Sequence, residues 1–257
     1  MNPPQSPPAV DVEITTRGAV SSAAPDYARA KVRAVLGRIH EPVLAVRVKL
    51  TQEAHHAIVR PSVAQAVVDL DGRPVRAHVA AATMQEAVDL LQDRLLARLD
   101  RARQRHHPIS HGVRVGPGRE DHRPQHVPRP PQERRIVRRK SYGLRRESPL
   151  TAVLDLEAMD HAFHLFTDAA TGFDAVVHRD EHDGTHRIAS AGVLAAPVPG
   201  LGVSTDAVPE LTVAQAADRL GLTGAPFVFF TDTATGRGNV LYHRYDGHYG
   251  LITPAEA

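Results

Sequence analysis

Alternation of apolar and polar residues predicts four β-strands in the first hundred residues. Segments 10–14 and 44–50 place Val, Ile or Leu at every second position, which is the period of a half-buried strand. Segments 63–70 and 74–81 flank Asp71-Gly72, a pair of residues that accepts the positive φ of a tight turn. We therefore expect the last two of these strands to form a β-hairpin.

Two helices are predicted among these strands. The first covers about 25–36, with Ser22 as its cap and Gly37 as its stop. The second begins with the capping box Thr83 and Glu86, and its apolar face recurs at helical spacing as Val88, Leu91, Leu95 and Leu99. The order strand, helix, three strands, helix predicts an α+β domain over residues 8–105, of the double-stranded-RNA-binding kind.

The last hundred residues carry one pattern twice. The motif Phe-Thr-Asp-Ala-Ala-Thr-Gly at 166–172 returns 64 positions later, at 230–236, as Phe-Thr-Asp-Thr-Ala-Thr-Gly. The repeat predicts two small tandem α/β modules at 136–193 and 203–257, named copy 1 and copy 2. Modules of this size bury little apolar surface alone, so we expect them to pack on each other as a pseudo-dimer.

A helix is expected before each motif, at 150–159 and 211–220. The apolar strand residues that follow are expected to form the interface between the copies. They are Phe163, Phe166, Val176, Phe227, Phe230, Val240 and Tyr242. Because both copies lie in one chain, their pairing is intramolecular, at an effective concentration of around a millimolar, and the protein is expected to be a monomer.

Two segments without strand or helix periodicity are expected to connect these parts. Residues 106–135 are rich in proline and arginine and predict a disordered basic linker. The charge-free stretch 188–205 contains Pro197 and Pro199, which would break a spanning helix, so it predicts a connector between the copies and no membrane contact. Met1–Val10 lacks an apolar core, so no secretory signal is expected.

Charge is distributed unevenly along the chain. Residues 101–147 carry 14 Lys and Arg against 4 Asp and Glu, whereas residues 148–257 carry 5 against 14. A basic centre beside an acidic end predicts a polyanion as partner, and nucleic acid is the leading candidate. A solvated basic linker without a partner is the alternative. The absence of cysteine excludes disulfides and thiolate chemistry and suits a reducing cytoplasm.

The second helix carries four arginines on one stripe. Arg94, Arg98, Arg101 and Arg105 are spaced by four, three and four positions. Such a stripe gains most where phosphates lie beside it, so these residues are predicted to bind RNA, although a solubilising face is the alternative. Further candidates from the first helix and the sheet are Arg29, Arg33, Arg47, Lys49 and Arg76.

Histidines offer a different hypothesis. His106, His107 and His111, or His178, His182 and His186, can be drawn as ligands of a metal-dependent hydrolase. The first set lies in the expected linker, and the second lies in an expected hairpin where spacing by four does not gather side chains. No phosphate-binding glycine loop, nucleophile elbow or paired carboxylate motif accompanies them. We therefore expect no metal, no cofactor and no enzymatic activity.

Three stretches resemble the bacterial ribosome hibernation-promoting factors of the long form. The first is 75–78 leading into 83–89, where Met84, Ala87 and Asp89 carry the match. The second is the basic strand Ile136–Lys140, and the most specific is the final hairpin 239–252. The chain departs from that family in its doubled C-terminal module.

The resemblance implies a protein without catalysis that binds the decoding groove of the small ribosomal subunit. There it would contact ribosomal RNA, exclude messenger and transfer RNA and inhibit translation under stress. In the family the single C-terminal domain pairs between two molecules and joins two ribosomes. Ribosomal proteins are candidate partners for the tail of this chain. Pairing within this chain would instead hold single ribosomes inactive. A general RNA-binding stress protein without ribosome specificity is the alternative.

Overall fold

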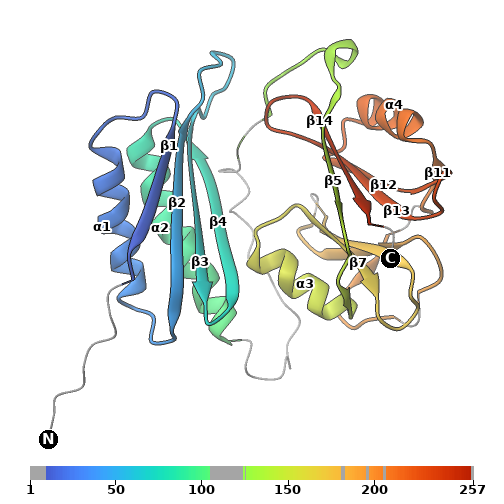
Figure 1. Ribbon diagram of the computed structural model, residues 1–257, viewed down its shortest axis with the longest axis horizontal. Coiled ribbons are helices and arrows are strands. Elements are labelled where there is room, and N and C mark those ends of the chain that lie inside the picture. The colour runs from blue at the N-terminus through green and yellow to red at the C-terminus, as the bar shows by residue number, and fades with distance from the viewer. Residues whose placement is uncertain are drawn as a thin grey trace, which may run out of the picture. The chain divides into compact units, whose positions relative to one another are not determined.

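The computed structural model describes residues 10–104, 124, 126–180, 183–194, 197–204 and 207–255. Contacts between Cα atoms divide these residues into two units. The first unit holds residues 10–104 with Pro124 and Ala158–Asp160, and the second holds the remaining described residues. Figure 1 shows the elements of each unit in colours that follow the sequence. None of the helices in the described ranges combines the length and apolar character needed to span a bilayer.

The first unit is a four-stranded sheet with two helices on one face (Figure 1). The strands lie in the order β1-β2-β3-β4, with β1 parallel to β2 and the other neighbours antiparallel. Alternate strand residues, including Val46, Val48 and Leu50, are buried beneath the helices. The elements are β1 (Val12–Arg17), α1 (Ala24–Leu36), β2 (Val43–Gln52), β3 (Ser62–Leu70), β4 (Arg73–Ala81) and α2 (Met84–Gln104).

Local signals in this unit are mostly those that the sequence indicates. Asp71 and Gly72 both have positive φ, 51° and 79°, as the tight turn between β3 and β4 requires. Glu86 N donates to Thr83 Oγ1 at 3.2 Å, while Glu86 Oε2 accepts from the backbone nitrogen of Ala82, one residue before the expected position. Ser22 does not cap α1, because Ala23 is the N-cap residue and makes no side-chain hydrogen bond.

The second unit contains two five-stranded sheets that exchange their outer strands. The strand orders are β10-β9-β8-β7-β6 and β11-β12-β13-β14-β5. The elements, with the short 3-10 helix η1, are η1 (Pro131–Glu133), β5 (Ile136–Tyr142), β6 (Arg146–Glu147), α3 (Pro149–Ala158), β7 (Phe163–Asp168), β8 (Asp174–Arg179), β9 (His186–Ser190), β10 (Gly202–Val203), β11 (Glu210–Leu211), α4 (Val213–Thr223), β12 (Phe227–Asp232), β13 (Gly238–His243) and β14 (Tyr249–Pro254).

The exchanged strands change the expected module boundaries. β5 opens copy 1 in sequence but pairs with β14 of copy 2, and β10, which begins one residue before copy 2, pairs with β9 of copy 1. The registers correspond, since Arg138 lies opposite Gly250 and Gly202 lies opposite Arg187. Within the stretch 188–205, residues 188–190 belong to β9 and Gly202–Val203 form β10, so the whole of it is not the connector that its composition suggests. Each folded module is therefore completed by a strand from the other copy.

Each sheet of the second unit has two buried faces. One face packs on the helix of its own module, α3 for copy 1 and α4 for copy 2. The other face joins a cluster shared by both copies, with Leu165, Val176, Phe229, Val240 and Ile252 at its centre. This arrangement stacks helix, sheet, sheet and helix around three small cores.

The described end of the expected linker is ordered. Val127 N donates to the carbonyl oxygen of Tyr245 at 2.8 Å, and the ring of His126 stacks on Tyr245 with centroids 5.2 Å apart. Gly247, with φ 78°, makes room for this contact, because a Cβ there would lie 2.5 Å from the carbonyl oxygen of Val127. The expectation of a disordered segment to 135 is wrong from His126 onward, since this stretch docks on the turn between β13 and β14.

Candidate functional site

Three of the basic residues expected to bind RNA gather on the sheet face of the first unit that is opposite to the helices. Cross-strand register places Arg47 beside Val67 and Val67 beside Arg76, while Lys49 lies two residues along β2 from Arg47. Arg76 donates to Gln65 Oε1 at 3.0 Å, and Arg47 is 3.2 Å from the exposed Glu13 carboxylate. Exposed ion pairs are weak, so Glu13 does not prevent Arg47 from contacting a phosphate.

The arginines of α2 differ from the exposed stripe that their spacing predicts. Arg94 and Arg98 are buried, and both donate to Asp160 Oδ1, at 2.8 and 2.5 Å. Asp160 Oδ2 accepts from the backbone nitrogen of His78 at 3.1 Å. A phosphate at Arg94 or Arg98 would compete with a carboxylate that is already bound. Arg101 is half-buried, and Arg105 lies outside the described residues.

The two candidates on α1 lie apart from the sheet cluster and are both paired. Arg29 donates to Asp26 at 2.5 Å, and Arg33 lies 3.9 Å from the Asp11 carboxylate. Spacing in sequence predicted one stripe of four arginines on the second helix and left the other five residues as further candidates, whereas the structure separates the described ones by face. The sheet group of Arg47, Lys49 and Arg76 is the candidate RNA-binding surface of this unit.

In the second unit, five of the seven expected interface residues lie in the cluster shared by the copies: Phe163, Val176, Phe227, Val240 and Tyr242. The Phe163 and Phe227 rings have centroids 4.8 Å apart, and Phe163 and Tyr242 are 5.7 Å apart. Phe166 and Phe230 are instead buried in the cores of their own modules. Successive strand residues point to opposite faces, so Leu165 and Phe229 occupy the interface positions.

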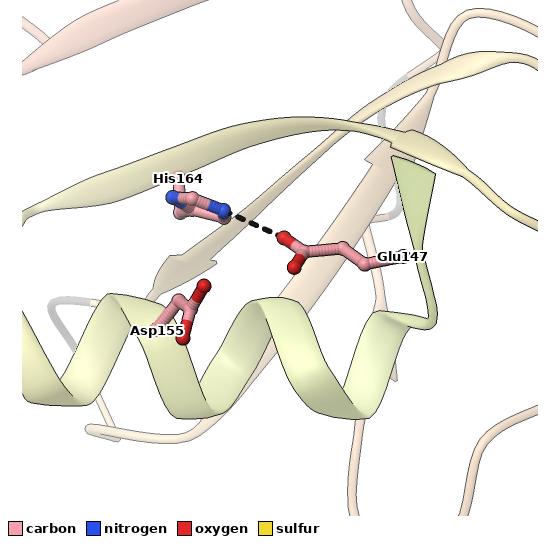
Figure 2. Close-up of side chains that lie close together, drawn as sticks. All are labelled: Glu147, Asp155 and His164. Atoms are coloured by element: carbon pink, nitrogen blue, oxygen red, sulfur yellow. Dashed lines mark hydrogen bonds and ion pairs between the residues drawn. The ribbon is translucent and has the colours of Figure 1, made fainter. Parts of the chain in front are cut away.

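Three side chains of copy 1 converge from β6, α3 and β7 in an arrangement that sequence reasoning missed (Figure 2). His164 Nε2 is 2.8 Å from Glu147 Oε1, and one ligand atom from each of Glu147, Asp155 and His164 lies within 4.8 Å of the others. Arg145 supplies the neighbouring positive charge, 2.7 Å from Asp155 and 3.7 Å from Glu147. The cluster is thus an ion-pair network in which a metal would have to displace Arg145.

Comparison of the copies shows that this network is specific to copy 1. The positions 64 residues later hold Leu211, Arg219 and Val228, so an apolar pair replaces Glu147 and His164. This internal comparison is the sequence signal that would have found the cluster.

The histidines that were weighed as alternative metal ligands do not come together among the described residues. His186 Nε2 lies 2.9 Å from Glu157 Oε1, and Arg179 donates to the same carboxylate. His178 is directed elsewhere, with its Nδ1 3.4 Å from the carbonyl oxygen of Arg179, and burial lowers its pKa. His182 and the set at 106, 107 and 111 lie outside the described residues.

Similarity to known proteins follows the two units. A model of the family described as "Sigma 54 modulation protein / S30EA ribosomal protein" matches residues 12–107. The model of the family's C terminus matches twice, at 131–186 and at 203–251. The chain belongs to this family. The second match to the C terminus coincides with copy 2 and sets this member apart from a chain with one such domain.

Relatives include two proteins with named roles. The "Dormancy associated translation inhibitor" of Mycobacterium tuberculosis (strain ATCC 25618 / H37Rv) is 40% identical over 204 residues, which cover 76% of this chain and 71% of that protein. The "Ribosome hibernation promotion factor" of Bradyrhizobium diazoefficiens is 37% identical over 51 residues, 20% of this chain and 25% of that protein. The crystal structure of the Thermus thermophilus Protein Y N-terminal domain superposes with a TM-score of 0.30 at 22% identity, covering 36% of this chain and 97% of that chain.

Proposed function

We propose that this protein is a cytoplasmic ribosome hibernation factor that inhibits translation without catalysing a reaction. It binds the decoding groove of the small subunit through its first unit and excludes messenger and transfer RNA. The observation that carries this proposal is the 40% identity, over most of both chains, to a dormancy-associated translation inhibitor. Family membership of both units supports the same conclusion.

The first unit suits ribosomal RNA because of its charge and shape. Its basic sheet group, Arg47, Lys49 and Arg76, lies on two strands of a rigid sheet, where cations can meet phosphates at fixed spacing. Structured RNA is recognised largely through phosphates and helix shape, and few aromatic side chains are needed. The whole chain has no Trp, 5 Tyr and 6 Phe, which does not favour stacking on single-stranded bases.

The second unit supports a factor that holds single ribosomes. In the related long-form proteins the C-terminal domain pairs between two molecules. Here the corresponding sheet faces already cover each other within one chain, and the exchanged strands β5 and β10 connect the copies further. Among the described strands of this unit, the sheet face through which the related domains pair is already covered in both copies. No such face is left for a second molecule, so the protein acts as a monomer on one ribosome.

Competition on purified small subunits tests the proposal. The full chain should cosediment with small subunits, and its binding should decrease when messenger RNA and initiator transfer RNA are bound first. It should also inhibit translation in an extract at concentrations near that of the ribosomes. A structured RNA of similar length, unrelated to the ribosome, serves as control. Equal affinity for this control RNA and for subunits would favour a general RNA-binding protein and overturn the proposal.

A further inference from the structure

Equivalent residues of the two copies meet in pairs at the centre of the shared interface. Phe163 and Phe227, which are related by 64 positions, pack ring against ring at 4.8 Å. Asp174 and Gly238, related by the same interval, also touch, since Gly238 N donates to Asp174 Oδ2 at 2.9 Å. Residues that contact their own counterparts lie at the pseudo-twofold axis of the pair.

Charge and size are unequal across this axis. Asp174 is buried, with 4% of its side chain exposed, and Arg237 donates to it through Nε at 2.7 Å and through a terminal nitrogen at 3.1 Å. Thr167 Oγ1 donates to the same carboxylate at 3.2 Å. The counterpart of Asp174 is Gly238, and the counterpart of Arg237 is Phe173, so the carboxylate and the guanidinium occur once each.

Gly238 is required by the close approach of the copies. A Cβ at this position would lie 2.7 Å from the Cβ of Asp174, closer than side-chain carbons approach each other, and 2.8 Å from the Phe229 ring. Two copies of the first kind would therefore bring two Asp174 side chains into collision. They would also bury two carboxylates with no arginine at the position of Arg237, and an unpaired buried charge is strongly destabilising.

Two copies of the second kind would meet with glycine against glycine. Each Arg237 would then lack the carboxylate that binds it, although no collision would arise. Only the pairing of copy 1 with copy 2 brings one carboxylate, that of Asp174, to one guanidinium, that of Arg237, and leaves space for both at Gly238. Repulsive elements of this kind commonly set partner choice in protein interfaces.

We propose that Asp174, Arg237 and Gly238 restrict each copy to pairing with the other copy, so that like copies do not pair between chains. The surface of copy 1 fits copy 2 of the same chain and rejects a second copy 1. This inference rests on the contacts at the axis and does not depend on ribosome binding. It also distinguishes the duplicated tail from a tail with a single self-pairing domain.

Variants of the full chain that make the axis symmetric test this proposal through the melting temperature of the second unit. Gly238→Asp gives both copies the residue of copy 1 and should lower the melting temperature by on the order of 10 °C. Gly238→Ala adds the Cβ without the charge and should have a smaller effect. The triple variant F173R/D174G/G238D moves the carboxylate to the other side of the axis and places an arginine at the position equivalent to Arg237, while Arg237 itself stays. This variant should restore most of the melting temperature.

Two results would overturn the proposal. One is a melting temperature of Gly238→Asp equal to that of the wild type or of Gly238→Ala, because the second carboxylate would then be tolerated. The other is a triple variant no more stable than Gly238→Asp, because the damage would then be local and independent of the pairing. If Gly238→Asp does not fold, a folded triple variant supports the proposal and an unfolded triple variant rejects it.

Discussion

Protonation of His243 is predicted to destabilise the second unit in mild acid. The ring lies at the end of β13, with centroids 5.8 Å from His126 and 5.1 Å from Tyr249. Burial, followed by the positive charges of Arg134 and His126, lowers the pKa of His243 from 6.5 to about 4. The unfolded chain lacks these surroundings, so protons bind the unfolded state more tightly than the folded state.

The sign and size of the effect follow from this difference in pKa. A depressed pKa contributes stability that is fully present above pH 6.5 and is lost as the pH falls towards 4. The full difference corresponds to at most about 3.4 kcal/mol. Because the ring is only half-buried, solvent screening reduces this value, and we expect about 1 kcal/mol, equivalent to roughly 3 °C in melting temperature.

Thermal unfolding of the wild type and of His243→Gln at pH 7.5 and at pH 4.5 measures this contribution. The melting temperature of the wild type should fall by roughly 3 °C more than that of the variant over this interval. His40→Gln, after the end of α1, is the matched control and should behave as the wild type does. A His243→Gln variant whose stability falls as steeply as that of the wild type would refute the reasoning.

Three further predictions concern the two candidate sites and the first unit. Replacing Arg47, Lys49 and Arg76 by glutamine should make the affinity for small subunits depend less on salt. The slope of log affinity against log salt should fall by about one for each phosphate interaction that is lost. An unchanged slope would show that these three side chains face solvent. The double variant E147L/H164V, which carries the apolar residues of copy 2, should melt at or above the wild-type temperature, and a lower melting temperature would contradict this expectation. Metal analysis of the wild type should find no bound ion. Residues 1–105 alone should inhibit translation, and inhibition by the tail fragment alone would reverse the assignment.

Local sequence patterns were sufficient for most of the fold. Period-two alternation and the Asp71-Gly72 turn predicted the strands of the first unit, and the 64-residue repeat predicted that the copies pair. Assigning Phe166 and Phe230 to the interface was wrong because it ignored strand parity, by which residues three apart face opposite sides. The exchange of β5 was not predictable, since β5 has no alternation of burial and its place depends on long-range pairing with β14.

Side-chain partners distant in sequence were the least predictable feature. Arg94 and Arg98 form a regular stripe, but the carboxylate that binds them belongs to Asp160, more than sixty residues away. The network of Glu147, Asp155 and His164 similarly draws on a strand, a helix and a second strand. Spacing rules apply within one helix or strand, so they do not reveal clusters that only the tertiary fold assembles.

Sucrose-gradient sedimentation of ribosomes with saturating full-length protein tests the central claim most directly. If the two copies of one chain cover each other's sheet faces, the protein should sediment with single ribosomes. No peak of paired ribosomes should form at any protein concentration. A peak of paired ribosomes that contains the protein would contradict the account, because it would show that the C-terminal modules join two chains.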